Sequence, residues 1–258
     1  MDDAAEVVRR IAGDLVAVDA APGIGVVWGT LALALLLVAW GPAWRRTRHV
    51  VTIAHEGGHA AAALLSGRRL TGIRLHADTS GVTVSRGRPT GPGMVLTVAA
   101  GYPAPALVGL AAASMLAAGR AAGALWVTAL LLAAMLLMIR NLYGLLVLLL
   151  AGAGVVLLSW WADPAVRSTV AHVVAWVLLL GAPRAVLELW SERRRQRGAP
   201  GTGRSDADQL GRLTPLPAGL WTAIFLAVVL AAGAAGALAL TGSARPESVG
   251  FLAGTLGR

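Results

Sequence analysis

The chain has 258 residues, of which 57% are hydrophobic and 14% are charged. Soluble domains contain about 45–50% apolar and about 25% charged residues, so this composition excludes an ordinary soluble enzyme and a disordered chain. Cysteine is absent, which excludes disulfide bonds and metal sites built on thiolates. The 22 basic residues are all arginine and give a net charge of +9, and their position at the ends of apolar runs indicates a membrane surface rather than nucleic acid.

Seven apolar runs follow a mixed N-terminal segment. Residues 1–23 carry apolar positions at helical spacing, which favours a short amphipathic helix, and they lack the basic-then-apolar order of a signal peptide. Backbone groups in hydrocarbon must be satisfied within their own segment, so we expect each run to be a helix. The short second run and the tight join at Arg140 leave this count open by one. The runs are Ile24–Trp40, Val50–Ser66, Met94–Ala118, Ala121–Ile139, Leu142–Trp161, Thr169–Trp190 and Gly219–Leu240.

Two polar stretches interrupt the runs. Residues 67–92 alternate apolar and polar positions on both sides of a turn at Asp78–Gly81, which predicts a β-hairpin. Residues 191–217 form a basic loop that begins with a cluster of arginines. The sequence therefore predicts an all-α polytopic membrane protein of about seven transmembrane helices, with one short membrane-associated β-hairpin. We expect a polar segment at 1–23, one membrane domain at 24–241 and a tail at 242–258.

The distribution of arginine predicts the orientation. Four predicted spans separate the stretches 67–92 and 191–217, so both stretches lie on the same side of the membrane. They are richer in arginine than the opposite side, and the richer side is expected to be cytoplasmic. This places the N-terminus inside and the C-terminus outside, in a multi-pass protein of the plasma membrane. The arginines of 45–48 fall on the other side in this count and weigh against it.

The segment His55-Glu56-Gly57-Gly58-His59 matches the H-E-x-x-H pattern. Positions i and i+4 of a helix share a face, so both imidazoles reach one metal ion, and Glu56 beside them is placed to act as a general base. Charged and polar groups within a membrane helix cost about 2.5–3.5 kcal/mol each, which favours a functional role over packing.

The sequence from Ala54 to Leu75 resembles the zinc-binding helix of the site-2 proteases, the intramembrane zinc metallopeptidases. It is similar in particular to a compact, membrane-only bacterial and actinobacterial branch, over about residues 50–230. Outside H-E-x-x-H each shared motif is short. The motifs of that branch appear here as His55–Ala60, Gly81–Val84, Gly101-Tyr102, Arg140-Asn141 and Ser205-Asp206-Ala207 through Leu210.

This resemblance implies an intramembrane endopeptidase with one Zn²⁺ per chain, bound by His55, His59 and an aspartate from a distant helix. The family's Asn-x-x-Pro…Asp-Gly segment is matched only at Asn141, after which no acid follows nearby. Asp206 is the preferred third ligand, because it lies in the Ser-Asp-Ala motif on the expected cytoplasmic side. Asp208 is the main alternative, and water or Asn141 completes the site if neither carboxylate does.

The resemblance also implies the partners. The substrate is expected to be a membrane-spanning protein, cut in or near its span, within the lipid bilayer and without nucleic acid; the oligomeric state is open. Asn141 is the candidate substrate-binding residue. In this family a β element pairs with the unwound substrate, whereas the alternation alone predicts no more than an ordinary cytoplasmic hairpin.

Two other functions compete with a protease. The first is a catalytically silent protein of the same fold that binds a metal or a client, and the intact Glu56 argues against it. The second is a transporter, which should show polar positions on several spans or an inverted repeat. The sequence shows neither.

Overall fold

The computed structural model describes residues 2–20, 22–195 and 205–243, which form a helical bundle with one small antiparallel sheet. Most of the predicted tail at 242–258 and the middle of the basic loop lie outside these residues. The elements in chain order are α1 (Asp2–Val16), α2 (Ile24–Ala39), α3 (Gly41–Leu65), β1 (Arg69–Leu75), β2 (Gly81–Arg86), α4 (Pro92–Ala99), α5 (Pro103–Ala117), α6 (Ala121–Met138), α7 (Leu142–Trp161), α8 (Pro164–Arg195), α9 (Asp206–Leu213) and α10 (Ala218–Gly242).

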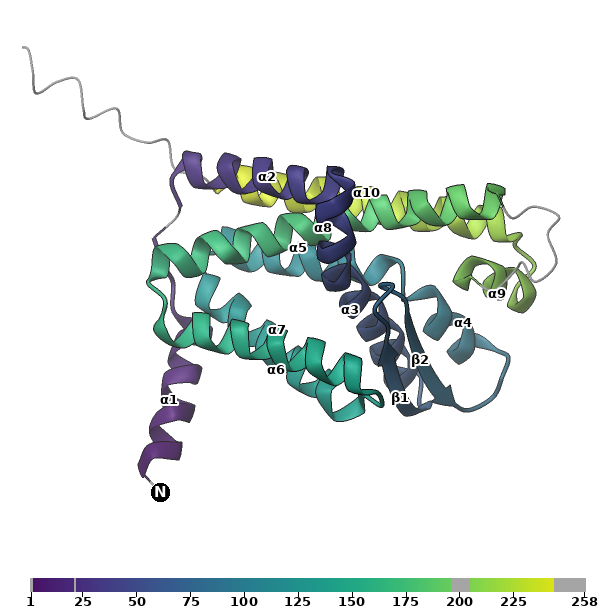
Figure 1. Ribbon diagram of the computed structural model, residues 1–258, viewed down its shortest axis with the longest axis horizontal. Helices are drawn as coiled ribbons and strands as arrows, with labels where there is room; N and C mark the ends of the chain where they lie inside the picture. Colours follow the sequence, from purple (N-terminus) through teal and green to yellow (C-terminus); the bar gives the residue numbers. More distant parts are fainter. Residues whose placement is uncertain (1, 21, 196–204, 244–258) are drawn as a thin grey trace, which may run out of the picture.

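The long helices lie side by side along the longest axis of the molecule, and α3 crosses them (Figure 1). Their close approach depends on small residues, as is usual for helices packed in a membrane. A Cβ atom added to Gly109 of α5 would lie 3.0 Å from the Leu179 side chain of α8, and one added to Gly236 of α10 would lie 2.7 Å from it. Leu179 is therefore held between two glycines, and α8 packs directly on α5 and α10.

The two ends of the bundle are formed by different elements (Figure 1). The sheet, α4 and α9 lie at one end, which we call the hairpin end, and α1 lies at the other, the α1 end. One core cluster joins Val27 of α2 to Ala171 and Leu240 toward the α1 end. A second joins Leu189 of α8 to Leu210 of α9 toward the hairpin end.

Four helices of the described chain, α6, α7, α8 and α10, are long and apolar enough to cross a membrane. Two further spans are possible if each of two bent pairs counts as one: α2 with α3, bent by 102°, and α4 with α5, bent by 66°. The described helices thus give four to six spans, and the predicted number of seven is not confirmed. The run Val50–Ser66 belongs to α3, and the run Met94–Ala118 is broken at residues 100–102.

Local sequence explains both bends. Trp40 has an extended backbone that ends α2, and Pro42 then begins α3, where its missing N–H group is not needed. Pro103 begins α5 in the same way. Because α3 bends away from the direction of α2, α2 is the one helix that runs along the bundle between α1 and the sheet. As a result, α1 and the hairpin lie at opposite ends of the bundle (Figure 1). The sequence predicted two membrane crossings between the N-terminus and the hairpin, which would place both on the same side of the membrane. The structure differs from this prediction, because one helix and not two runs between them.

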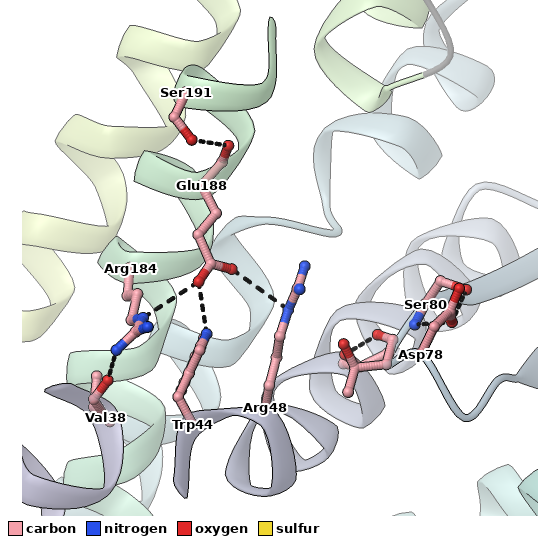
Figure 2. A network of polar contacts seen from close by, with 10 residues as sticks. Val38, Trp44, Arg48, Asp78, Ser80, Arg184, Glu188 and Ser191 are labelled. Atoms are coloured by element: carbon pink, nitrogen blue, oxygen red, sulfur yellow. Dashed lines mark hydrogen bonds and ion pairs between the residues drawn. The ribbon is translucent and has the colours of Figure 1, made fainter. Parts of the chain in front are cut away.

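A polar network ties the α2–α3 bend to α8 (Figure 2). Glu188 of α8 accepts hydrogen bonds from Trp44 Nε1 at 2.6 Å and from Arg184 Nε at 3.2 Å through its Oε1 atom. Its Oε2 atom lies 3.6 Å from Arg48 Nε. The Arg184 guanidinium donates to the Val38 carbonyl near the end of α2 and stacks on the Trp44 ring, 4.8 Å from its centroid. Glu188 therefore holds α3 and Arg184 holds the end of α2, so this ion pair of α8 fixes both helices of the bend.

The predicted hairpin is present as strands β1 and β2, which pair antiparallel with Ile73 opposite Thr83. The other edge of β1 is covered by the segment after α6, where Arg140 N donates to the Ile73 carbonyl at 2.8 Å. Asn141 extends this contact, since its amide donates to the Leu75 carbonyl at 2.6 Å and accepts from the Leu75 N–H at 3.2 Å. Within the described chain, β2 has no second strand beside it.

Candidate metal centre and active site

Helix α3 presents His55 and His59 one turn apart, as the motif predicts. Their Nε2 atoms are 3.1 Å apart, and the rings meet edge to face with centroids at 4.6 Å. The two Nε2 atoms are therefore close enough to bind one metal ion.

Asp206, at the first turn of α9, brings a carboxylate to the same point. Its Oδ2 atom lies 3.3 Å from His55 Nε2 and 3.2 Å from His59 Nε2. Ligand atoms of a tetrahedral zinc site are about 3.3 Å apart, because the bonds to nitrogen and oxygen are about 2.0–2.1 Å long. Asp206 Oδ2 is also buried without a hydrogen bond. Distances and donor set therefore fit a Zn²⁺ ion, and these three side chains are the group of the described chain that could hold one.

The second nitrogen of His59 supports this arrangement. Nδ1 lies 2.7 Å from the backbone carbonyl of Thr97 in α4. An N–H at Nδ1 donates to this carbonyl, which leaves Nε2 as the nitrogen that can bind a metal ion. Metal-binding histidines are commonly oriented by such a contact.

The Asp206 carboxyl is held in the charged form that a metal ligand requires. Burial raises the pKa of Asp206, but the contacts with His55 and His59 lower the pKa by more than burial raises it. The net effect places the pKa below its usual range, so the carboxyl is ionised at neutral pH.

The break between α4 and α5 brings backbone against the imidazoles. A Cβ atom added to Gly101 would lie 2.4 Å from His59 Nε2 and 2.7 Å from His55 Cε1, so only glycine fits there. Tyr102 follows and packs edge-on against the His55 ring at 4.8 Å, while its other neighbour is Phe225 of α10, stacked at 5.3 Å. The sequence showed the Gly-Tyr pair but gave no reason for it.

We expect Gly101→Ala to weaken zinc binding strongly, because the added methyl group displaces both imidazoles from the positions that converge on Asp206. Second-sphere changes of this kind typically cost about 10- to 100-fold in metal affinity. Zinc competition with a chromogenic chelator measures the effect. Gly152→Ala is the matched control, since nothing lies within 4 Å of a Cβ atom at that position. Equal affinity of the two variants would contradict the crowded geometry.

Glu56 is buried, with 3% of its surface exposed, and its carboxylate faces the hairpin. The hydroxyl of Thr83 in β2 donates to Glu56 Oε2 at 2.6 Å. Gly81, at the start of β2, leaves room for the same carboxylate, because a Cβ atom there would lie 2.5 Å from Oε1. The Gly-Val-Thr-Val strand thus holds the side chain of Glu56, which the sequence pattern could not show.

We expect Thr83→Val to lower the cleavage rate about tenfold, because a hydrogen bond to a charged group contributes about 1.5–3 kcal/mol. Thr83→Ser keeps the hydroxyl and should restore most of the rate. Zinc affinity should stay unchanged in both, since Thr83 contacts Glu56 and no metal-binding side chain. Equal kcat values for the valine and serine variants would show that the hydroxyl does not orient the base.

Asp208 is directed to a different partner from Asp206. It completes a capping box at the start of α9, in which Ser205 Oγ accepts from the Asp208 N–H and the Asp208 side chain accepts from the Ser205 N–H. The same carboxylate pairs with the Arg193 guanidinium of α8. This engagement favours Asp206 over Asp208 as the third ligand.

Asn141, the candidate substrate-binding residue, lies beside the hairpin. Both polar atoms of its amide are used by Leu75 at the end of β1. The structure therefore brings Asn141 to the sheet and not into the group of His55, His59 and Asp206. A role for Asn141 toward substrate stays a prediction.

Comparison with known proteins supplies one match. The model of a family described as Peptidase M50B-like matches residues 28–236, which includes the H-E-x-x-H helix, the hairpin and α9. Neither the curated proteins nor the solved structures include a match to the chain.

Proposed function

The chain belongs to the Peptidase M50B-like family, the site-2 protease family of intramembrane metallopeptidases, and from this membership we propose that it is an active zinc endopeptidase. Its substrate would be a membrane-spanning protein, cut at a peptide bond in or near the span. The observation that carries the proposal is the convergence of His55, His59 and Asp206 at 3.1–3.3 Å beside the buried carboxylate of Glu56.

Each side chain has a separate task. His55, His59 and Asp206 would hold zinc, which when bound lowers the pKa of a water molecule and polarises the carbonyl of the peptide bond. Glu56 takes a proton from the attacking water and passes it to the nitrogen of the leaving amine. Thr83 keeps one oxygen of Glu56 in place during these transfers.

The hairpin has one edge available for an extended substrate. The edge of β1 is already covered by residues 139–141, whereas β2 has no second strand beside it among the described residues, so we place the added strand beside β2. Gly81 and Thr83 of β2 contact Glu56 directly, which puts that edge next to the general base. Addition of a strand would give the substrate backbone its hydrogen-bond partners once its helix has unwound.

The distribution of arginine supports an active site on the cytoplasmic side of the cell membrane. The segment 45–48, which opposed this orientation in the seven-span count, lies at the end of α8 that carries Glu188, close to the hairpin. Arginine-rich ends of membrane helices face the cytoplasm. Described arginines toward the hairpin end are Arg45, Arg46, Arg48, Arg68, Arg69, Arg74, Arg86, Arg88, Arg140, Arg184, Arg193, Arg194, Arg195 and Arg212, and those toward the α1 end are Arg9, Arg10, Arg120 and Arg167.

The test is cleavage of single-span membrane proteins by the purified chain in lipid vesicles, with zinc supplied. A panel of tagged candidate substrates is needed, and the product masses locate the cut. The matched inactive protein is Glu56→Gln. Cleavage of a panel member by the parent but not by this variant supports the proposal. Cleavage by both proteins alike would assign the activity to another site or to a contaminant.

A further inference from the structure

The two halves of the metal site come from elements far apart in the chain. His55 and His59 belong to α3, and Asp206 belongs to α9. A metal site of this kind requires its supporting contacts to hold the ligand atoms within a few tenths of an ångström. The described residues show what could supply that support, because both α3 and α9 are attached to the same helix, α8.

The first attachment is Glu188 of α8. Its carboxylate accepts from Trp44 and lies beside Arg48, and both of these residues belong to the first part of α3 (Figure 2). Arg48 precedes His55 by seven residues, so the two side chains lie on the same face of α3, two turns apart. Glu188 therefore fixes the helix that presents the imidazoles.

The second attachment is Arg193 of α8, five residues further along. Its guanidinium pairs with Asp208 and donates to Ser205 Oγ at 3.3 Å. Ser205 and Asp208 flank Asp206 and form the capping box of α9. Ala207 and Leu210 are fully buried in the core and fix the depth of α9. The Arg193 contact then fixes the turn that carries Asp206.

We propose that the last turns of α8 set the geometry of the metal site through these two charged anchors, so that Glu188, Arg193 and Asp208 are positioning residues. The proposal rests on the proposed function of the site. It assigns to the end of α8 a role beyond membrane anchoring and arginine-based orientation. It also accounts for the ionic groups of Glu188 and Arg193, which are partly buried against α3 and α9 rather than turned into solvent.

The experiment compares Glu188→Gln, Arg193→Gln and the double variant with the parent as full-length proteins in detergent. Zinc affinity is measured by competition with a chelator, and the visible absorption of the Co²⁺-loaded protein reports the ligand geometry directly. Each single variant should bind zinc about tenfold more weakly, within the range typical of residues that support metal ligands. The cobalt bands should change in intensity, and kcat should fall with KM unchanged.

Two controls separate positioning from folding. Arg194→Gln removes the neighbouring arginine, which is exposed and stacks on Trp190, and it should bind zinc as the parent does. Arg193→Lys keeps the charge and should recover part of the lost affinity. Thermal melting of the chelator-treated proteins, followed by tryptophan fluorescence, should give similar midpoints for all variants.

Three results would overturn the proposal. Unchanged zinc affinity and cobalt spectra in the double variant would show that α8 does not set the site. A loss of zinc affinity accompanied by a large fall in the melting midpoint of the metal-free protein would show that the two residues support the general stability of the fold and not the metal site. Failure of the parent protein itself to bind zinc would instead refute the proposed function, and with it the role of the positioning residues.

Discussion

Replacing Glu56 with glutamine should abolish cleavage while zinc remains bound. The amide has the shape of the carboxylate and can still accept the hydrogen bond from Thr83, but it cannot take a proton from water. Loss of a general base typically lowers a rate by about 10²- to 10⁴-fold. Zinc affinity should be unchanged, because Glu56 is not among the three converging ligand residues.

The measurement is product formation from a vesicle-embedded substrate, together with zinc per chain by elemental analysis. Glu192→Gln is a matched control, since it makes the same chemical change at an exposed position on α8. A Glu56→Gln protein that cleaves at the parental rate would rule out this carboxylate as the base. Lost cleavage accompanied by lost zinc would assign Glu56 to metal binding instead.

Replacing Asp206 with alanine should reduce bound zinc from about one ion per chain to a small fraction. The substitution removes one of three protein ligands and leaves two imidazoles, too few for the sites that zinc enzymes use. Elemental analysis after gel filtration in zinc-free buffer measures the ratio. Cleavage should fall in parallel, because no other carboxylate of the described chain belongs to the group.

Asp208→Asn provides the sharpest comparison. It changes the neighbouring carboxylate, which contacts Arg193 and Ser205, and it should still bind one zinc per chain at saturating zinc but with lower affinity. Asp163→Ala, an exposed position at the start of α8, should have no effect. If the Asp206→Ala protein bound a full equivalent of zinc and the Asp208→Asn protein bound none, Asp208 and not Asp206 would be the third zinc ligand.

The sequence was sufficient for the helical membrane class, the hairpin and the family. Long apolar runs can form only helices in hydrocarbon, and the alternation of Ile73 and Leu75 with polar neighbours admits only a strand. The H-E-x-x-H spacing fixes the relation of His55 to His59, because both lie on one helix. These are local properties, and the structure and the family match agree with them.

Properties that depend on separate elements were not predictable to the same degree. Hydropathy does not register the break at residues 100–102, which divides one apolar run without adding charge. It also does not show that α3 begins directly after Trp40 and continues through the arginines of 45–48. Pro42 and Pro103 were the available signals, since proline favours the first turn of a helix. The contacts of Thr97 with His59 and of Thr83 with Glu56 join elements that no spacing rule connects.

The sequence carries a local signal for the choice between the two aspartates. Ser205 followed three residues later by Asp208 has the spacing of a capping box, a pattern that commits the later carboxylate to the helix terminus. Asp206 is then the acid of this pair that remains for another role. The same reasoning cannot show that Asp206 reaches His55, because that depends on the packing of α9 in the core.

The 102° turn between α2 and α3 also bears on how the proposed hydrolysis obtains its water molecule. Each turnover consumes one water molecule, and the hydrocarbon interior supplies almost none. Because α3 turns aside, His55 and Glu56 lie at an end of the bundle bordered by polar loops, and the His55 and Asp206 side chains each keep 20% of their surface exposed. Water can therefore reach the reaction centre by a short path from this end of the bundle, without crossing the length of the four long helices.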